Sequence, residues 1–159
     1  SVSSFQVNDI FTDDYDVYKI VISDIDGAST DNWSHMRFVG EQGNLIQTSS
    51  YSFAGHQFRS YAGVSENKNT SQSEFQYLFF DAATTPGACA VIYVFNPTNT
   101  SYFTSIIAES NGFNGTSGTD GHKYIGIYRV ENKITGFGFR RASGTYDSIT
   151  ARTYGMRSD

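Results

Sequence analysis

Three aspartates that lie close together are the residues best suited to bind a metal ion. Asp24, Asp26 and Asp31 fall in one short segment together with Gly27 and Ser29. Calcium prefers carboxylate oxygens of this kind. The spacing differs from that of an EF-hand loop, however, and Asp and Gly are also common turn residues. The pattern favours a solvated turn and leaves a Ca²⁺ site as the alternative.

The remaining metal-binding or nucleophilic side chains are scattered. His35, His56 and His122 form no local ligand motif, so a transition-metal site would need the fold to bring them together. Cys89 is the single cysteine and lies in an apolar run without a basic neighbour. This context predicts a small buried hydrophobic residue rather than a reactive thiol.

No catalytic motif is present. The sequence contains neither a G-x-S-x-G elbow nor a glycine-rich loop that ends in Gly-Lys-Ser/Thr. A glycosidase needs two carboxylates that face each other across a cleft, and the spacing selects no pair among Glu74, Asp81, Glu109 and Asp120. We therefore predict that the chain is not an enzyme, and the sequence identifies no catalytic, cofactor-binding or metal-binding residue.

Aromatic side chains are the remaining candidates for binding. Tyr and Trp can stack on sugars or anchor an interface, because each combines an apolar ring with a polar group. Each is more simply explained as a residue of the core or of a sheet face. The candidates are Trp33, Tyr51, Tyr61, Tyr77, Tyr102, Tyr128 and Tyr146.

Composition limits the possible partners. Charged residues make up 17% of the 159 residues, aromatic residues make up 16%, and the net charge is −5. Arg140-Arg141 is the only adjacent basic pair, which argues against binding to nucleic acid or to an anionic membrane. No apolar run approaches the ~20 residues of a membrane span, and the first residues lack a secretory-signal pattern. We expect no membrane insertion.

Alternating apolar and polar residues indicate the fold class. Residues 123–130 alternate clearly, residues 88–95 are the most hydrophobic run, and residues 16–26 are apolar on both faces, which predicts a strand in the middle of a sheet. Turn residues separate the runs every 8–12 positions. No window shows the apolar period of an amphipathic helix. The sequence predicts an all-β, antiparallel, jelly-roll-like β-sandwich of about eight to ten strands, with residues 1–159 forming a single domain.

Three segments carry more specific predictions. Residues 133–156 predict a closing hairpin over Ala142-Ser143-Gly144, in which Gly144 supplies the positive φ of the turn. Residues 63–72 and 110–121 are long and polar and predict two exposed loops. We expect these loops to contact partners.

Several short segments also occur in a recognisable order. They are Phe11-Thr12-x-x-Tyr15-Asp16-x-Tyr18, Arg37-Phe38, Phe95-Asn96-Pro97, Ile134-Thr135-Gly136-Phe137, Ser143-Gly144 and Tyr154-Gly155. In this order the chain resembles small proteins encoded by tailed bacteriophages, especially marine and cyanobacterial ones, which are generally described as tail-fibre or virion structural proteins.

The resemblance implies a structural or adhesion component on the surface of a phage particle. It would belong to a tail fibre or receptor-binding module, or would decorate the head. The implied partners are other tail or capsid proteins, further copies of the chain in a homo-oligomer, with a trimer favoured, and a host surface glycan. No cofactor is implied. The alternative is a carbohydrate-binding, lectin-like module, which the aromatic residues and the Asp24/Asp26/Asp31 segment favour. Its binding would depend on Ca²⁺ if that segment binds calcium.

Overall fold

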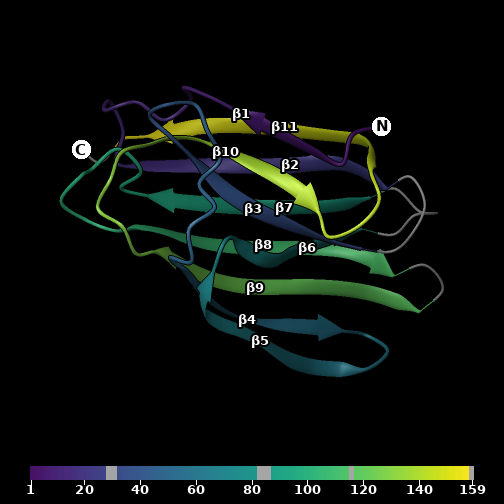
Figure 1. The fold of residues 1–159 in the computed structure, drawn as a ribbon. Helices are drawn as coiled ribbons and strands as arrows, with labels where there is room; N and C mark the ends of the chain where they lie inside the picture. Colours follow the sequence, from purple (N-terminus) through teal and green to yellow (C-terminus); the bar gives the residue numbers. More distant parts are fainter. Residues whose placement is uncertain (28–31, 82–86, 115–116, 158–159) are drawn as a thin grey trace.

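The chain folds into two antiparallel β-sheets that face each other. The structure is a computed structural model, and it describes residues 1–27, 32–81, 87–114 and 117–157. These residues form eleven strands and no helix, and therefore no helix that could cross a membrane (Figure 1). The predicted all-β sandwich is confirmed, while the jelly-roll topology stays a prediction.

The two sheets differ in width. The wider sheet has seven strands in the order β11 (Tyr146–Met156), β2 (Val17–Gly27), β7 (Ala88–Phe95), β8 (Thr104–Asn114), β9 (Gly118–Tyr128), β4 (Tyr51–Arg59) and β5 (Gly63–Gln72). The narrower sheet has four strands in the order β1 (Ser4–Val7), β10 (Ile134–Arg141), β3 (Asn32–Gly40) and β6 (Phe75–Asp81). The narrower sheet therefore has fewer strands with which to cover the inner face of the wider one.

Aromatic rings fill the space between the sheets. Phe75 of β6 meets the Tyr51 ring edge-on at 4.9 Å and the Phe38 ring at 5.5 Å. Tyr128 of β9 lies 4.9 Å from Tyr51, so both sheets contribute to one cluster. All four side chains are fully buried. Edge-to-face pairs of this kind add to the stability gained from burial alone.

The C-terminal segment is not a hairpin, contrary to the prediction. Its two strands form as expected, but β10 pairs with β1 and β3 while β11 pairs with β2 in the other sheet. Residues 142–145 therefore connect the sheets. Gly144 has the expected positive φ of 74°. Turn residues suit a crossover as well as a hairpin. Because β10 is buried along nearly its whole length, its backbone N–H and C=O groups need a paired strand at each edge, and β1 and β3 supply these.

The two predicted loops are also wrong. Residues 63–72 form β5, an edge strand that pairs with β4, and residues 110–121 form the end of β8 and the start of β9, which pair as a hairpin around the undescribed residues 115–116. Both segments are polar because much of their surface is exposed. Cys89 of β7 is exposed rather than buried, because the buried side of this strand starts at Ala88.

A change at Gly136 tests how tightly β1 lies against β10. A Cβ atom at this position would overlap the carbonyl oxygen of Val7, whereas a Cβ on Gly40 would lie 3.7 Å from Ile46 in ordinary contact. We expect Gly136→Ala to lower the free energy of unfolding by about 1–3 kcal/mol. The control Gly40→Ala should leave it nearly unchanged. Urea unfolding measures both, and equal stability of the two variants would contradict this packing.

Candidate functional site

The outer face of the seven-stranded sheet carries an exposed apolar row. The row runs across four neighbouring strands through Tyr93, Ile107, Ile125 and Ala54, each paired with the next. Ile107 is 47% exposed and Ile125 is 60% exposed. Large aliphatic side chains this exposed, side by side on adjacent strands, form a continuous apolar surface.

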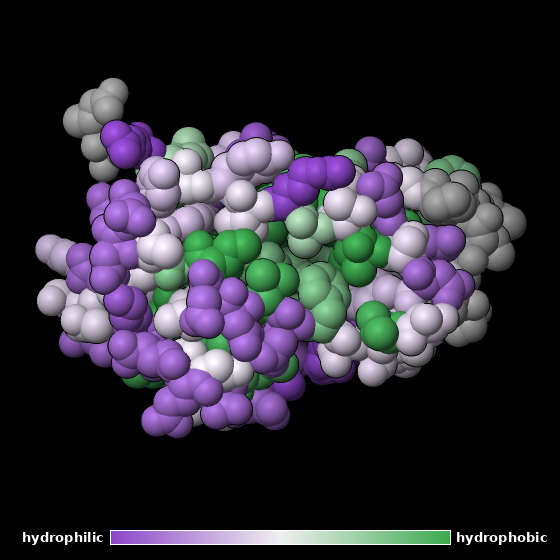
Figure 2. Space-filling model, turned by 90° about the horizontal axis from the view of Figure 1, so that it is seen from above, coloured by the Kyte–Doolittle hydropathy of each residue, from purple (hydrophilic) through white to green (hydrophobic). Residues whose placement is uncertain are grey.

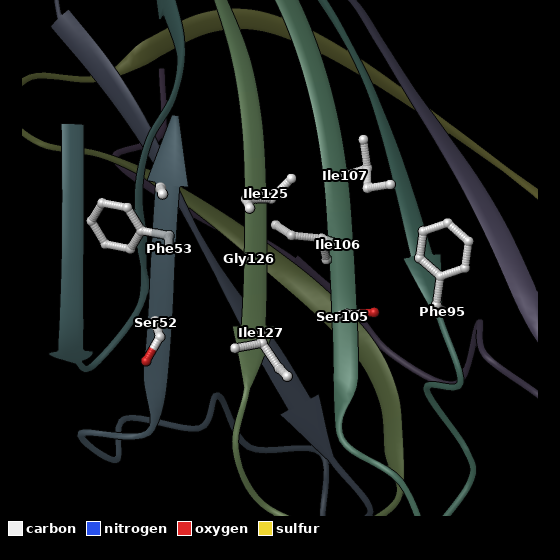
Figure 3. A pocket seen from close by; sticks show the side chains of 10 residues that line it. Ser52, Phe53, Phe95, Ser105, Ile106, Ile107, Ile125, Gly126 and Ile127 are labelled. Carbon is white, nitrogen blue, oxygen red and sulfur yellow. The ribbon is translucent and has the colours of Figure 1, made fainter. Parts of the chain in front are cut away.

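A second row deepens this surface into a groove. Phe95, Ser105, Ile127 and Ser52 pair in register across the same strands, one step along from the first row. Figure 3 shows these side chains on neighbouring strands around the labelled isoleucines. Apart from Tyr93, the residues of the two rows line an open hollow of about 520 Å³. We call it the apolar groove, defined by Phe95, Ile107, Ile125 and Ile127.

The apolar groove has a charged border. An adjoining hollow of about 410 Å³ shares Ile107 and Ile125 and is also lined by His56, Glu66, Glu109 and Lys123. Lys123 and Glu109 form an exposed ion pair at 3.1 Å. An apolar centre with a polar rim is the usual arrangement of a protein–protein interface.

Apolar side chains continue beyond the groove toward β11. Val17 pairs with Phe95 and Met156 pairs with Val17, which extends the second row onto β2 and β11. Tyr154 and Met156 are 51% and 42% exposed. Figure 2 looks onto the side of the molecule where β1 and β11 lie, and there too some hydrophobic residues are exposed among hydrophilic ones. An antiparallel sheet with one solvated face normally shows polar residues on that face, so this sheet is suited to having its outer face covered.

A buried polar network occupies the inner face of the same sheet at β4 and β9. Asp120 is 1% exposed and accepts hydrogen bonds from Gln57 Nε2 at 2.9 and 2.8 Å and from the Tyr61 hydroxyl at 3.2 Å. Asn114 Nδ2 donates to the Tyr61 oxygen at 2.7 Å, which carries the network to the molecular surface. Burial raises the pKa of Asp120, and the hydrogen bonds from Gln57 and Tyr61 oppose this shift.

An aromatic cluster adjoins this network. His122 follows Asp120 on the inner face of β9, and its ring lies 4.5 Å from the ring of Trp33 on β3. Trp33 also meets the rings of Tyr77 and Phe80 at 5.7 and 4.9 Å. Burial lowers the pKa of His122 to about 4, and the nearby Tyr77 backbone opposes this shift only in part. The ring is therefore neutral at physiological pH.

The three aspartates considered for calcium are only partly described. Asp24 lies at a register shift in β2 with a φ of 54°, and it accepts a hydrogen bond from Ser23 at 3.0 Å. Asp26 lies in the same strand, and Asp31 lies outside the described residues. In the parts of the chain that the structure describes, no three metal-ligating side chains form a cluster. The calcium site stays a prediction.

The fold keeps the other candidate residues apart. His35 contacts Glu74, His56 lies on the outer face of β4, and His122 is buried inside. Glu74 binds His35 and arginines, and Glu109 pairs with Lys123 on the outer face of β8. Of the carboxylates, Asp120 alone faces the sandwich interior in the described chain, so Glu74, Glu109 and Asp120 do not share a cleft.

Sequence reasoning did not find the apolar groove. A usable signal existed, because Ile106-Ile107 and Tyr124-Ile125 each place apolar residues on both faces of a strand. The same signal correctly suggested that β2 is an inner strand of its sheet.

Comparison with models of protein families gives no match to this chain, and comparison with curated protein sequences gives none either.

The burial of His122 predicts a pH dependence of stability. The folded state holds the ring neutral down to about pH 4, whereas an unfolded chain takes up the proton near pH 6.5. Between these values the unfolded state binds more protons, so stability falls as the pH falls. From pH 7.5 to pH 5, His122 should account for a loss of about 2 kcal/mol.

Two variants isolate this effect in urea unfolding at the two pH values. His122→Phe should lose less stability than the wild type between pH 7.5 and pH 5, by about 2 kcal/mol. The control His56→Phe removes an exposed imidazole and should follow the wild type. A wild-type slope in His122→Phe would show that the ring is already able to take up a proton in the folded state.

Proposed function

We propose that this chain is a non-catalytic structural or adhesion component of a bacteriophage virion, in a tail fibre or receptor-binding module or as a head decoration. The order of the segments from Phe11 to Gly155 supports the phage assignment. The observation that carries the mode of action is the apolar groove, where Ile107 and Ile125 are exposed side by side.

The groove supports docking onto protein. Exposed apolar area costs free energy in water, at about 25 cal/mol per Å², and contact with another protein removes this cost. The border of Glu109 and Lys123 supplies charges of both signs around the apolar centre. The partner is another virion protein or a further copy of the chain, and a homotrimer is the favoured assembly.

Location in the particle is the first test. Cryo-electron microscopy of purified particles, with quantitative mass spectrometry, gives the position and copy number of the chain. We expect either many copies on the head, for a decoration protein, or a few copies on the tail, for a fibre or receptor-binding module. Absence from purified particles would contradict the proposal.

A charge placed in the apolar groove should block docking without unfolding the chain. Ile125→Lys puts an ammonium group where a partner would exclude water, which we expect to weaken assembly or particle incorporation at least about tenfold. Val64→Lys is the matched control, because Val64 is 63% exposed on edge strand β5 and lies outside the groove. Sedimentation velocity and particle incorporation measure the effect, and circular dichroism confirms folding.

If Ile125→Lys assembles and enters particles as well as Val64→Lys does, the groove is not the docking surface. A loss in both variants would point to a general effect of the added charge and would also count against the groove.

A lectin-like module is the second candidate, favoured by the polar and aromatic groups around Asp120. Tyr61 and Asn114 end this network at the surface, and Trp33 provides a partly exposed ring nearby. Sugar-binding sites commonly combine hydrogen-bonding groups with an aromatic face. A host surface glycan would be the ligand.

A glycan array with the isolated domain tests this candidate, with and without Ca²⁺. Binding that Tyr61→Phe and Trp33→Ala both weaken would support a site at this end of the sandwich. Loss of binding in chelator would point to the Asp24, Asp26 and Asp31 segment. Absence of binding to every glycan on the array would count against the lectin function.

A further inference from the structure

A buried carboxylate gathers three basic side chains at the outer face of the four-stranded sheet. Glu74, just before β6, has a side chain only 2% exposed. His35 Nδ1 donates to Glu74 Oε1 at 2.8 Å, and Arg140 Nε donates to Oε2 at 2.8 Å, with a second bond from Arg140 Nη2 to Oε1. Arg37 Nη2 lies 3.1 Å from Oε2.

Charge in this cluster is not balanced. Burial alone would raise the pKa of Glu74, but hydrogen bonds from His35 and Arg140 outweigh it and lower the pKa to about 2. Glu74 therefore carries one negative charge at neutral pH, while Arg37 and Arg140 carry two positive charges. The net charge is at least +1 whatever the protonation state of His35, in a chain whose total charge is −5.

A small cavity adjoins the positive side chains. It has a volume of about 60 Å³ and is lined by Ser4, His35, Arg37, Leu45, Gly138, Phe139 and Arg140. Two nitrogens of this cluster, Arg37 Nε and His35 Nε2, are buried and have no hydrogen-bond partner among the described residues. His35 Nε2 is itself an acceptor when Nδ1 carries the proton that is donated to Glu74. Arg37 Nε is a charged donor, and leaving such a donor buried without an acceptor is costly. An acceptor in the cavity would remove part of this cost.

We propose that this cavity binds a single carboxylate group. The guanidinium groups of Arg37 and Arg140 share the single carboxylate of Glu74. A second carboxylate in the cavity would balance the charge and accept a hydrogen bond from Arg37 Nε. The volume exceeds that needed for one water molecule and suits a group of about three heavy atoms. The carboxylate comes either from a free small acid or from an acidic side chain of a partner protein. This inference does not rest on the proposed virion function, because the site lies on the other sheet from the apolar groove.

A carboxylate built into the chain gives the sharpest test. Ser4 is exposed on edge strand β1, lines the cavity and pairs with Arg140 in the ladder. Ser4→Asp should place its carboxylate at the cavity, while Ser4→Asn has nearly the same shape without the charge. We expect the thermal midpoint of Ser4→Asp to exceed that of Ser4→Asn by about 2–4 °C at neutral pH. The difference should disappear when Arg37→Gln is added to both.

Ligand binding is tested on the wild-type chain with sodium acetate, at ionic strength held constant with sodium chloride. Acetate at about 100 times its Kd should raise the midpoint by about 5 °C or more. Arg37→Gln should weaken acetate binding about tenfold. Lys133→Gln is the control, because it also removes one positive charge but from the exposed ion pair with Asp13.

A third experiment distinguishes the two possible sources of the carboxylate. A capped tripeptide with a central Glu that binds more tightly than acetate supports a partner side chain, and one that binds more weakly supports a free acid. The proposal is overturned if acetate and chloride act alike and Ser4→Asp is no more stable than Ser4→Asn. That outcome would mean that ordered water satisfies Arg37 and His35.

Discussion

Contact between the two sheets depends on the aromatic cluster around Phe75. This ring comes from edge strand β6 of the narrower sheet and packs against Tyr51 of the wider one. A Cβ on Gly126 would come within 2.6 Å of the same ring, so β9 approaches it without a side chain in between. The position of β6 over β8 and β9 follows from this contact, and with it the relative placement of the sheets.

The unequal widths of the sheets explain where the polar groups lie. Near the middle of the wider sheet, inner side chains such as Ile92 and Ile106 are buried under the narrower one. At the end of β4 and the start of β9, the inner face instead carries Gln57 and Asp120, which bond to each other. An inward carboxylate is tolerated there because amide and hydroxyl donors satisfy it. The polar network therefore lies at the border of the hydrophobic core, where apolar side chains of the narrower sheet no longer cover the wider one.

Much of the architecture could be predicted from the sequence, because period-two alternation survives in most strands. The apolar residues of β2 and β7 predicted both strands, although they did not predict that Cys89 of β7 is exposed. Pairing could not be predicted in the same way, since the turn at Gly144 permits either a hairpin or a crossover and only the whole fold decides between them. Strand β5 was not predicted because its side chains are polar and exposed to solvent, so they show no apolar alternation, although its backbone pairs with β4. The cluster on Glu74 could not be predicted either, because Glu74 lies 39 positions from His35 and 66 positions from Arg140.

The composition of β5 also affects how copies of this chain can associate. Its free edge is ten residues long and could in principle recruit a strand from another molecule and extend the sheet without limit. The edge instead presents Glu66, Asn67 and Lys68, and a lysine or glutamate on an edge strand opposes such pairing. Growth of the sheet by strand addition at this edge, which would lead to fibrils, is therefore disfavoured.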